Sequence, residues 1–273
     1  MEIIKSLKSI LLEERLVNFI NRKRNKTFLD SRTLFTINYN NRKTKIYLNK
    51  KFGYVDQYIY NHGIYEKDII DSIREFLNPE KIMLDIGGNI GQHSLLLAPY
   101  CKMIYAFEPI PAIFNEFKSS ISANHYKNIH LQNVAIGDKS EIKPIYFNTK
   151  NAGASTLLKN TNGNKPINIK VEHLNSVLPK DLKFDVVKID VEGFEAVVIL
   201  GNKELFIKNK PVIFLELDPK SIDFEGSHST VELLHFFFDN DYEIYKRNKD
   251  KTYSEYSEEL NEIDNLIIKP KKL

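Results

Sequence analysis

The chain has 273 residues, of which 42% are hydrophobic and 27% are charged, and it contains one cysteine. This composition is typical of a globular protein and excludes a disordered or fibrous chain, an intrachain disulfide framework and a multi-cysteine zinc site. The net charge of +3 is uneven, because residues 1–26 carry +4 and residues 27–273 therefore carry −1.

The N-terminal part is predicted to form a helix followed by a β-hairpin. Apolar residues recur at about helical spacing through residues 2–20, which predicts an amphipathic helix. Residues 33–48 contain β-branched and aromatic runs on either side of Asn40 and Asn41, which is a hairpin signal.

We interpret residues 1–58 as an N-terminal extension and residues 59–273 as the main domain. Two roles remain open for the extension. In the first, its helix packs on the protein or mediates homo-oligomer formation. In the second, its basic end around residues 22–24 makes peripheral contact with an anionic membrane. No apolar run approaches the ~20 residues of a membrane span, and no secretory signal begins the chain. A cytoplasmic location is therefore expected, with contact limited to the inner face of the membrane.

From residue 82 onward, short apolar runs alternate with helix-length segments. Such near-continuous apolar runs are typical of parallel strands covered on both faces, so we expect an α/β fold with a mostly parallel, doubly wound sheet. The polar stretch 138–172 should add two strands, and an antiparallel hairpin should close the chain after a helix at 230–240. The runs predicted as strands are KIMLDI, MIYAFE, IHLQNV, FDVVKID and PVIFLEL, and the segments predicted as helices are GQHSLLLAPY, PAIFNEFKSSISANH and FEAVVILGNKELFIK.

The strongest motif is LDIGGNIG at residues 84–91, which follows one predicted strand and precedes a predicted helix. Its glycines allow backbone to approach a ligand closely, and the helix start should present free N–H groups. Glu108 ends the next strand, where a carboxylate can accept hydrogen bonds from ribose hydroxyls. The dinucleotide fingerprint G-x-G-x-x-G is absent. The pattern instead resembles the D-x-G-x-G-x-G turn of S-adenosylmethionine binders, in which Asp85 would anchor the turn or the amino group of the methionine moiety.

A second motif, FDVVKID, places Lys188 inside a predicted central strand. A buried lysine needs a carboxylate partner. Asp190 on the same strand and Glu216 on the following run are the nearest candidates, at the strand ends where ligands bind in open α/β sheets.

The chain resembles the FkbM family of methyltransferases over roughly residues 60–270. The resemblance depends on the order and spacing of several motifs, and it departs from the family pattern at Gly88, where alanine is usual, and at Asn175, where aspartate is usual. Glycine in place of alanine at position 88 is expected to be sterically harmless, and the role of the family's aspartate cannot be carried over to Asn175. The motifs are GIYE at 63–66, DIGGNIG at 85–91, FEP at 107–109, NVAIGD at 133–138, KIDVEGFE at 188–195 and FLEL at 214–217.

The resemblance implies a Rossmann-like class I methyltransferase fold, S-adenosylmethionine as donor, and O-methylation of a sugar or related hydroxyl, for example in polysaccharide biosynthesis. Together with the motifs it predicts two groups of site residues. The catalytic candidates are Asp190, Lys188, Glu216 and His93. The donor-binding candidates are Tyr65, Glu66, Asp85, Gly87, Gly88, Asn89, Gly91, Glu108, Pro109, Asn133, Val134, Ala135 and Asp190.

Asp190 is expected to act on the acceptor hydroxyl, either as a base or through a bound Mg²⁺. The acceptor would be a glycan or glycolipid. Two other functions remain open: a nucleic-acid methyltransferase and a non-catalytic adenosine-binding module. The net charge of −1 outside the N-terminus argues against the first. The intact KIDVEGFE motif beside the glycine turn argues against the second.

Overall fold

The computed structural model describes residues 32–49, 53–146, 166–248, 252–256 and 264–271. The predicted helix at 2–20 and the basic residues 22–24 lie outside these ranges, as does the middle of the polar stretch, 147–165.

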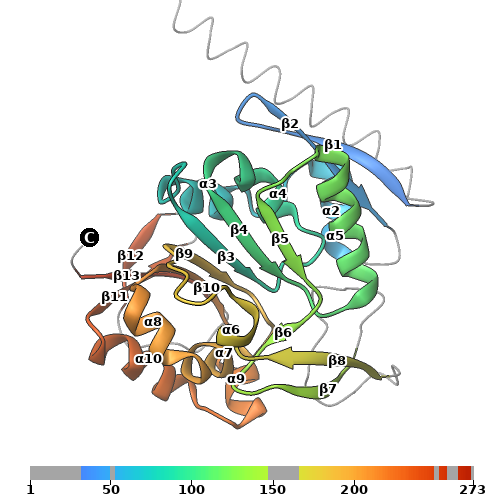
Figure 1. Ribbon diagram of the computed structural model, residues 1–273. Coiled ribbons are helices and arrows are strands. Elements are labelled where there is room, and N and C mark those ends of the chain that lie inside the picture. The colour runs from blue at the N-terminus through green and yellow to red at the C-terminus, as the bar shows by residue number, and fades with distance from the viewer. Residues whose placement is uncertain (1–31, 50–52, 147–165, 249–251, 257–263, 272–273) are drawn as a thin grey trace, which may run out of the picture.

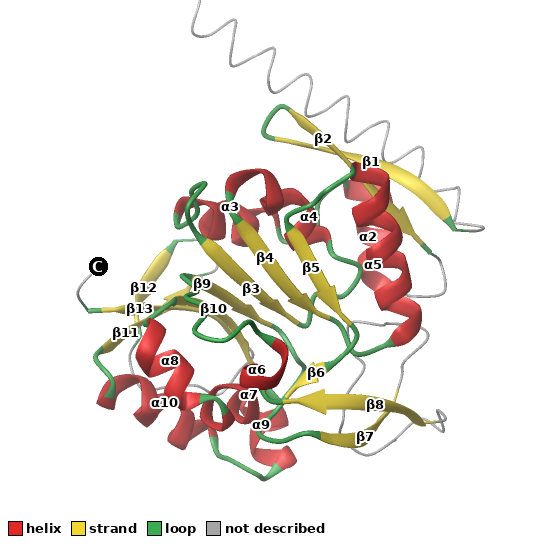
Figure 2. Ribbon diagram, viewed as in Figure 1, coloured by secondary structure: helices red, strands yellow, loops and turns green. Residues whose placement is uncertain are grey.

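The centre of the fold is an eight-stranded sheet in the order β12-β11-β13-β10-β9-β3-β4-β5 (Figures 1 and 2). The five strands from β10 to β5 are parallel to one another, whereas β13, β11 and β12 are antiparallel to their neighbours. The predicted parallel sheet and closing antiparallel hairpin are therefore confirmed. The strands are β3 (Ile82–Ile86), β4 (Met103–Phe107), β5 (Ile129–Gln132), β9 (Val186–Ile189), β10 (Val212–Leu217), β11 (Tyr242–Arg247), β12 (Tyr253–Glu255) and β13 (Asp264–Pro270).

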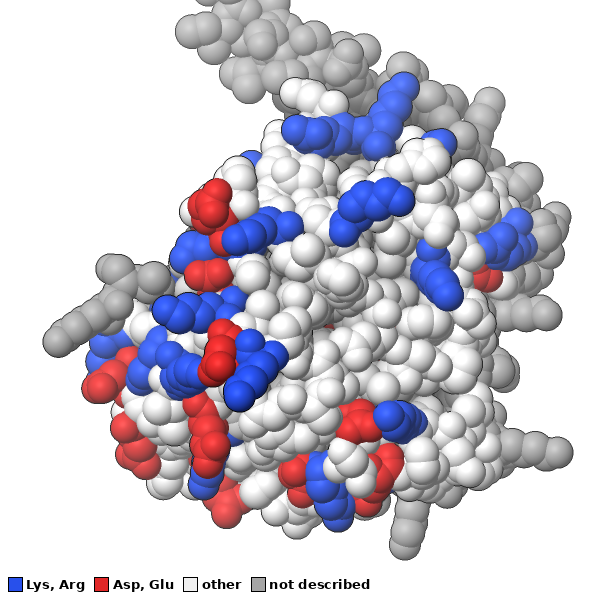
Figure 3. Space-filling view, in the orientation of Figure 1, with Lys and Arg blue, Asp and Glu red and all other residues white. Residues whose placement is uncertain are grey.

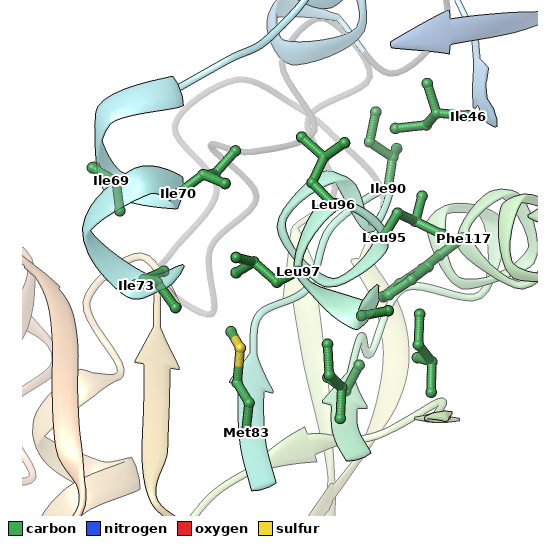
Figure 4. Packing of buried hydrophobic residues seen from close by; sticks show 14 of the residues in the cluster. Ile46, Ile69, Ile70, Ile73, Met83, Ile90, Leu95, Leu96, Leu97 and Phe117 are labelled. Atoms are coloured by element: carbon green, nitrogen blue, oxygen red, sulfur yellow. The ribbon is translucent and has the colours of Figure 1, made fainter. Parts of the chain in front are cut away.

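Helices cover both faces of this sheet (Figure 1). On one face α3, α4 and α5 share a core with β3 and β4, and Figure 4 shows isoleucines of α3 and leucines of α4 meeting Met83 of β3. On the other face α7, α8 and α10 share a second core with β9 and β10. The helices are α2 (Tyr54–His62), α3 (Lys67–Glu75), α4 (Gln92–Leu97), η2 (Ala98–Tyr100), α5 (Pro111–Asn124), α6 (Leu174–Val177), α7 (Glu195–Gly201), α8 (Lys203–Asn209), α9 (Pro219–Glu225) and α10 (Thr230–Asp239).

The predicted N-terminal hairpin is confirmed as β1 (Thr33–Tyr39) and β2 (Arg42–Leu48). Asn40 and Asn41 form its turn with φ angles of +45° and +61°, which asparagine tolerates better than most residues. The hairpin lies on α5, where the backbone N–H of Tyr47 donates to Ser120 at 2.9 Å. Its inner side chains join the core of the main sheet, and the division of the chain near residue 58 stays a prediction.

The two strands expected in the polar stretch are β7 and β8. Together with β6 they form a separate three-stranded sheet in the order β6-β8-β7. Its position matters for the site, because β6 follows β5 directly and turns away from the main sheet at the edge where the parallel strands end (Figure 2). The strands are β6 (Ala135–Ile136), β7 (Glu141–Tyr146) and β8 (Pro166–Glu172).

The prediction of a single helix over residues 194–208 was wrong. The segment forms two helices, α7 and α8, that meet at Asn202. The Asn202 side chain is buried and donates to the Gly137 carbonyl at 2.9 Å, while its oxygen accepts from the Leu174 backbone N–H at 2.8 Å. These tertiary hydrogen bonds hold the break, which helical periodicity alone could not indicate.

No helix within the described ranges is long and apolar enough to cross a membrane. In Figure 3, charges of both signs are interspersed over the surface that the C-terminal half of the chain forms. Lys and Arg side chains lie over the β1–β2 hairpin.

Candidate active site

A cavity opens at the carboxyl ends of β3, β4, β9 and β10. Ligands bind at this edge in open α/β sheets, near the point where the chain connections reverse direction. Most of the residues predicted from sequence line the cavity together: Tyr65, Glu66, Gly87, Gly88, Asn89, His93, Glu108, Pro109, Val134, Ala135, Lys188, Asp190 and Glu216.

The glycine turn and the loop after β9 touch each other at this cavity. Gly87 has a φ of +82°, and a Cβ built there would lie 1.9 Å from the carbonyl oxygen of Asp190. The turn amides are occupied, because Gly87 and Gly88 donate to the Phe107 carbonyl at 3.1 and 2.9 Å. These two glycines therefore approach the cavity through their absent side chains and not through free N–H groups.

Three predicted donor-binding residues lie behind the cavity wall. Asp85 is fully buried and accepts a hydrogen bond from the Ser94 hydroxyl at 2.5 Å, so it anchors the start of α4. A Cβ at Gly91 would come within 2.1 Å of the Phe117 ring. Asn133 donates to the carbonyls of Glu108 and Pro109 at 2.8 and 2.9 Å. These residues shape the wall and do not face the cavity.

The side chain of Phe117 packs close to Gly88, where glycine fits without a clash, as expected. A Cβ at that position would stand 3.0 Å from the Phe117 ring, so the ring would have to shift. Glycine therefore relieves a contact that alanine would tighten.

Glu108 links the second strand to the glycine turn. One carboxyl oxygen accepts from the Asn89 N–H at 3.0 Å and the other from the Ile110 N–H at 2.8 Å. Burial raises the pKa of Glu108 to about 7, although these two bonds oppose the rise. A carboxylate has about four lone-pair positions, so Glu108 keeps acceptor capacity for hydroxyls of a ligand.

The predicted lysine–carboxylate pair is confirmed, with Lys188 Nζ lying 3.0 Å from Asp190 Oδ2. Lys188 is buried, and burial by itself would lower its pKa. The carboxyl groups of Asp190, Asp85 and Glu66 outweigh that effect and raise the pKa above its ordinary value. The pKa of Asp190 is lowered because Lys188 overcomes the opposing effect of burial. Asp190 therefore stays ionised at neutral pH.

Two other carboxyl groups surround Asp190. The negative charge of Asp190, followed by burial, raises the pKa of Glu216 to about 9, and the protonated Glu216 hydrogen-bonds to Asp190. Burial and then Asp190 raise the pKa of Glu66 to about 7. We name Glu66, Lys188, Asp190 and Glu216 the acid cluster. Near neutral pH it holds one balanced ion pair beside carboxyl groups that retain protons.

His93, the predicted alternative base, begins α4 with its Nε2 3.6 Å from a carboxyl oxygen of Glu66. Burial and then the charge of Lys188 lower the pKa of His93 to about 3. The imidazole is therefore neutral at physiological pH and is a weak base. His62 does not line the cavity, and its ring lies against that of Tyr58.

Two positioning residues escaped prediction from sequence. The Gln92 side chain accepts from the Tyr65 N–H at 2.8 Å and donates to the Tyr65 carbonyl at 2.7 Å, which ties α4 to the loop before α3. Glu195 accepts from the N–H groups of Val191 and Gly193 at 3.3 and 3.0 Å and closes the loop after β9. Glu195 is the last residue of the KIDVEGFE motif, so the motif could have indicated its role. Gln92 contacts a residue 27 positions away, and no sequence pattern indicated its role.

Replacing Glu195 by glutamine is expected to stabilise the protein above pH 7. Burial raises the pKa of Glu195 to about 7 from the ordinary 4.5. Between these values the unfolded chain releases a proton that the folded chain retains, so stability falls by about 3 kcal/mol as pH rises through this window. Glutamine resembles the protonated form and keeps an oxygen for both N–H groups.

Urea unfolding at pH 5 and pH 8 measures this effect. The Glu195→Gln variant should lose less stability between the two pH values than the wild type, and Glu204→Gln, at an exposed position in α8, should match the wild type. Equal pH dependence in all three proteins would contradict the assignment.

The acid cluster does not support the predicted Mg²⁺ site. Within the part of the chain that the structure describes, no three His, Cys, Asp or Glu side chains form a group that could hold a metal ion. The oxygens of Asp190 are engaged by Lys188 and Glu216.

Cys101, the single cysteine of the chain, is unsuited to nucleophilic chemistry, because burial raises its thiol pKa to about 12.

A family model described as the Methyltransferase FkbM domain matches residues 85–244. This range contains the glycine turn, Glu108, the Lys188–Asp190 pair and Glu216.

Two characterised relatives show weaker similarity. "Methyltransferase 1" of Beauveria bassiana is 26% identical over 145 residues, which cover 45% of this chain and 58% of that protein, less than two thirds of its length. The hexuronic acid methyltransferase AglP of Haloferax volcanii is 25% identical over 198 residues, which cover 68% of this chain and 78% of AglP.

Solved structures are similar at low sequence identity. Methyltransferase FkbM from Methylobacillus flagellatus is 12% identical with a TM-score of 0.46, covering 81% of this chain and 56% of that chain. TYW2 from M. jannaschii in complex with AdoMet is 15% identical with a TM-score of 0.46, covering 88% and 86%.

Proposed function

The chain belongs to the FkbM methyltransferase family. From this membership we propose that it is an S-adenosylmethionine-dependent O-methyltransferase. Its proposed acceptor is a sugar hydroxyl in a cell-surface glycan or glycolipid. The observation that supports this most directly is the contact between Gly87 and the backbone of Asp190. It brings the turn proposed for the donor and the carboxylate proposed for the chemistry to one cavity.

The cavity lining combines two chemically different groups of residues that suit the two parts of S-adenosylmethionine. Apolar side chains, Ile110 and Ile113 of the main fold and Ile145 and Ile169 of the second sheet, suit an adenine ring. Glu108, which binds the Ile110 N–H, would hold the ribose hydroxyls. The acid cluster would face the charged methionine part.

The donor supplies a methyl carbon bonded to a positively charged sulfur. The protein must align an acceptor oxygen with that bond, and positioning of this kind can remove ~7–11 kcal/mol from a bimolecular barrier. Asp190 is ionised and can accept the hydroxyl proton. A base works best when its pKa lies near the working pH, so Glu66, with a pKa of about 7, is a second candidate for the same proton.

The similarity to AglP supports a glycan acceptor, because that protein is described as a hexuronic acid methyltransferase. The acid cluster adds support, because its carboxyl groups can bind sugar hydroxyls. Among the described lining residues its one cation, Lys188, is engaged by Asp190 and does not offer a site for the phosphates of a nucleic acid.

Calorimetry followed by a transfer assay tests the proposal. The protein should bind S-adenosylmethionine and not NAD, and it should move a labelled methyl group to glycans extracted from the native source. Absence of donor binding would contradict the cofactor. Transfer to RNA with none to glycans would contradict the acceptor.

The ribose assignment predicts that Glu108→Ala weakens donor binding by roughly tenfold to a hundredfold. That range follows from the ~1.5–3 kcal/mol of a hydrogen bond to a charged group. Calorimetry at pH 8 measures the affinity, at a pH where Glu108 is mostly ionised. Thermal unfolding checks folding, because Glu108 also holds the Asn89 N–H. Glu75→Ala, at an exposed position in α3, is the control. Unchanged affinity in a folded Glu108 variant would remove the ribose role.

A further inference from the structure

A group of aromatic rings leads from the acid cluster to the protein surface. Tyr54 and Tyr58 come from α2, and Tyr65 comes from the loop before α3. The three ring centroids lie 5.4–6.1 Å from one another, and His62 lies 4.6 Å from Tyr58. Tyr54 and Tyr65 both line the cavity. We call Tyr54, Tyr58 and Tyr65 the tyrosine platform.

The inner end of the platform reaches the proposed chemistry. The Tyr65 hydroxyl hydrogen-bonds to Glu66. Burial and then the charges of Glu66, Glu216 and Asp190 raise the pKa of Tyr65, and Tyr65 lines the same cavity as these three residues. An acceptor that occupies this cavity with a hydroxyl at Asp190 can therefore contact Tyr65.

The outer end of the platform is open. Tyr54 is 55% exposed although its ring contacts two other tyrosines. Phe224 is another exposed aromatic side chain, at 67%, but it does not line the cavity. Exposed aromatic surface beside a cavity offers a ligand a large, rigid apolar face with little loss of conformational entropy.

A pyranose ring matches this combination. One face of such a ring presents C–H groups that can stack on a tyrosine, and its edge presents hydroxyls that carboxyl groups can bind. A nucleotide would bring phosphates, which need cations. Among the described lining residues Lys188 is the only lysine or arginine, and Asp190 engages it.

We propose that the tyrosine platform binds the C–H face of the acceptor's pyranose ring and so directs one ring hydroxyl toward the acid cluster. This assignment rests on the proposed sugar O-methyltransferase function. It adds that Tyr54 recognises the acceptor and not the donor.

Saturation-transfer NMR on the protein bound to S-adenosylhomocysteine tests the platform. The probes are methyl glucopyranoside and methyl galactopyranoside, and sorbitol is an acyclic control with similar hydroxyls but no ring face. Saturation should reach the ring C–H protons of at least one pyranoside and should be weak for sorbitol. Tyr54→Ala should lower the affinity for that pyranoside roughly two- to tenfold, which corresponds to a stacking contact of ~0.5–1.5 kcal/mol.

Two variants separate stacking from other effects. Tyr54→Phe keeps the ring and should bind the pyranoside as the wild type does, and Phe224→Ala removes an exposed ring elsewhere and should also have no effect. In the glycan assay Tyr54→Ala should raise the acceptor KM with little change in kcat. Its affinity for S-adenosylmethionine should not change.

The outcomes distinguish this inference from the proposed function. If the wild type binds no S-adenosylmethionine, the proposed function fails and the platform assignment fails with it. If the donor binds and a methyl group reaches glycans, the platform alone is overturned by any of three results: no saturation of either pyranoside, equal pyranoside binding by Tyr54→Ala and wild type, or weaker donor binding by Tyr54→Ala.

Discussion

Asp190→Asn is expected to lower kcat by about two orders of magnitude or more while binding of S-adenosylmethionine persists. The range is that of a lost general base, ~10²–10⁴-fold. Asparagine keeps the shape of the side chain and an oxygen for Lys188, but it cannot accept the hydroxyl proton. Because Lys188 is buried, the variant should also lose stability, so activity is compared only at temperatures where both proteins are folded.

The matched control is Asp181→Asn. Asp181 also forms an ion pair with a lysine at 3.0 Å, but that pair is exposed on the surface. Such pairs contribute ~0–1 kcal/mol, so this variant should behave as the wild type. Direct base catalysis also predicts that EDTA leaves the wild-type rate unchanged. A wild-type rate in Asp190→Asn would transfer the role to Glu66 or to Glu192, which also lines the cavity. Restoration of an EDTA-inhibited enzyme by Mg²⁺ would contradict direct base catalysis.

Gly87→Ala is expected to destabilise the protein and abolish donor binding. Two costs add at this position. The φ of +82° penalises any side chain by ~1–2 kcal/mol. The new Cβ would also collide with the Asp190 carbonyl oxygen at 1.9 Å, and overpacking of this kind costs a further ~1–3 kcal/mol. Relief of the collision must move either the glycine turn or the end of β9, and both carry the site.

Gly226→Ala isolates the first cost. Gly226 has a similar φ of +79°, but the nearest atom to its Cβ would be 3.8 Å away. It lies at the end of α9, outside the cavity lining. Urea unfolding should show a larger loss for Gly87→Ala than for Gly226→Ala, and calorimetry should show donor binding only in the latter. Equal losses in the two variants would mean that backbone conformation alone matters at Gly87.

The acceptor side of the site depends on a part of the fold that local patterns did not predict. The tyrosine platform forms because α2 brings Tyr54 and Tyr58 against Tyr65, and neither α2 nor α3 was predicted. Gln92, which follows the glycine turn in the chain, then holds the Tyr65 backbone. These contacts join segments whose spacing has no regular period, so only the folded chain shows them.

The sequence by itself determined the features that arise from local chemistry. Apolar runs predicted the parallel strands, Asn40-Asn41 predicted the hairpin, and a lysine within a buried strand required the carboxylate that Asp190 supplies. The glycine turn and Glu108 line one cavity because strand ends in this type of fold converge on one edge, and their role in donor binding stays a prediction. Each prediction depends on neighbouring residues or on one strand's alternation.

Only the tertiary structure decided which side chains face the cavity and which carry charge. Asp85 belongs to the glycine motif yet lies behind the wall, because Ser94 of α4 binds it there. His93 is neutral and Glu216 protonated, because burial and the Lys188–Asp190 pair set their pKa values. Burial and the distance between charges depend on elements far apart in the chain, so a local pattern can place a titratable residue near the site but cannot assign its protonation state.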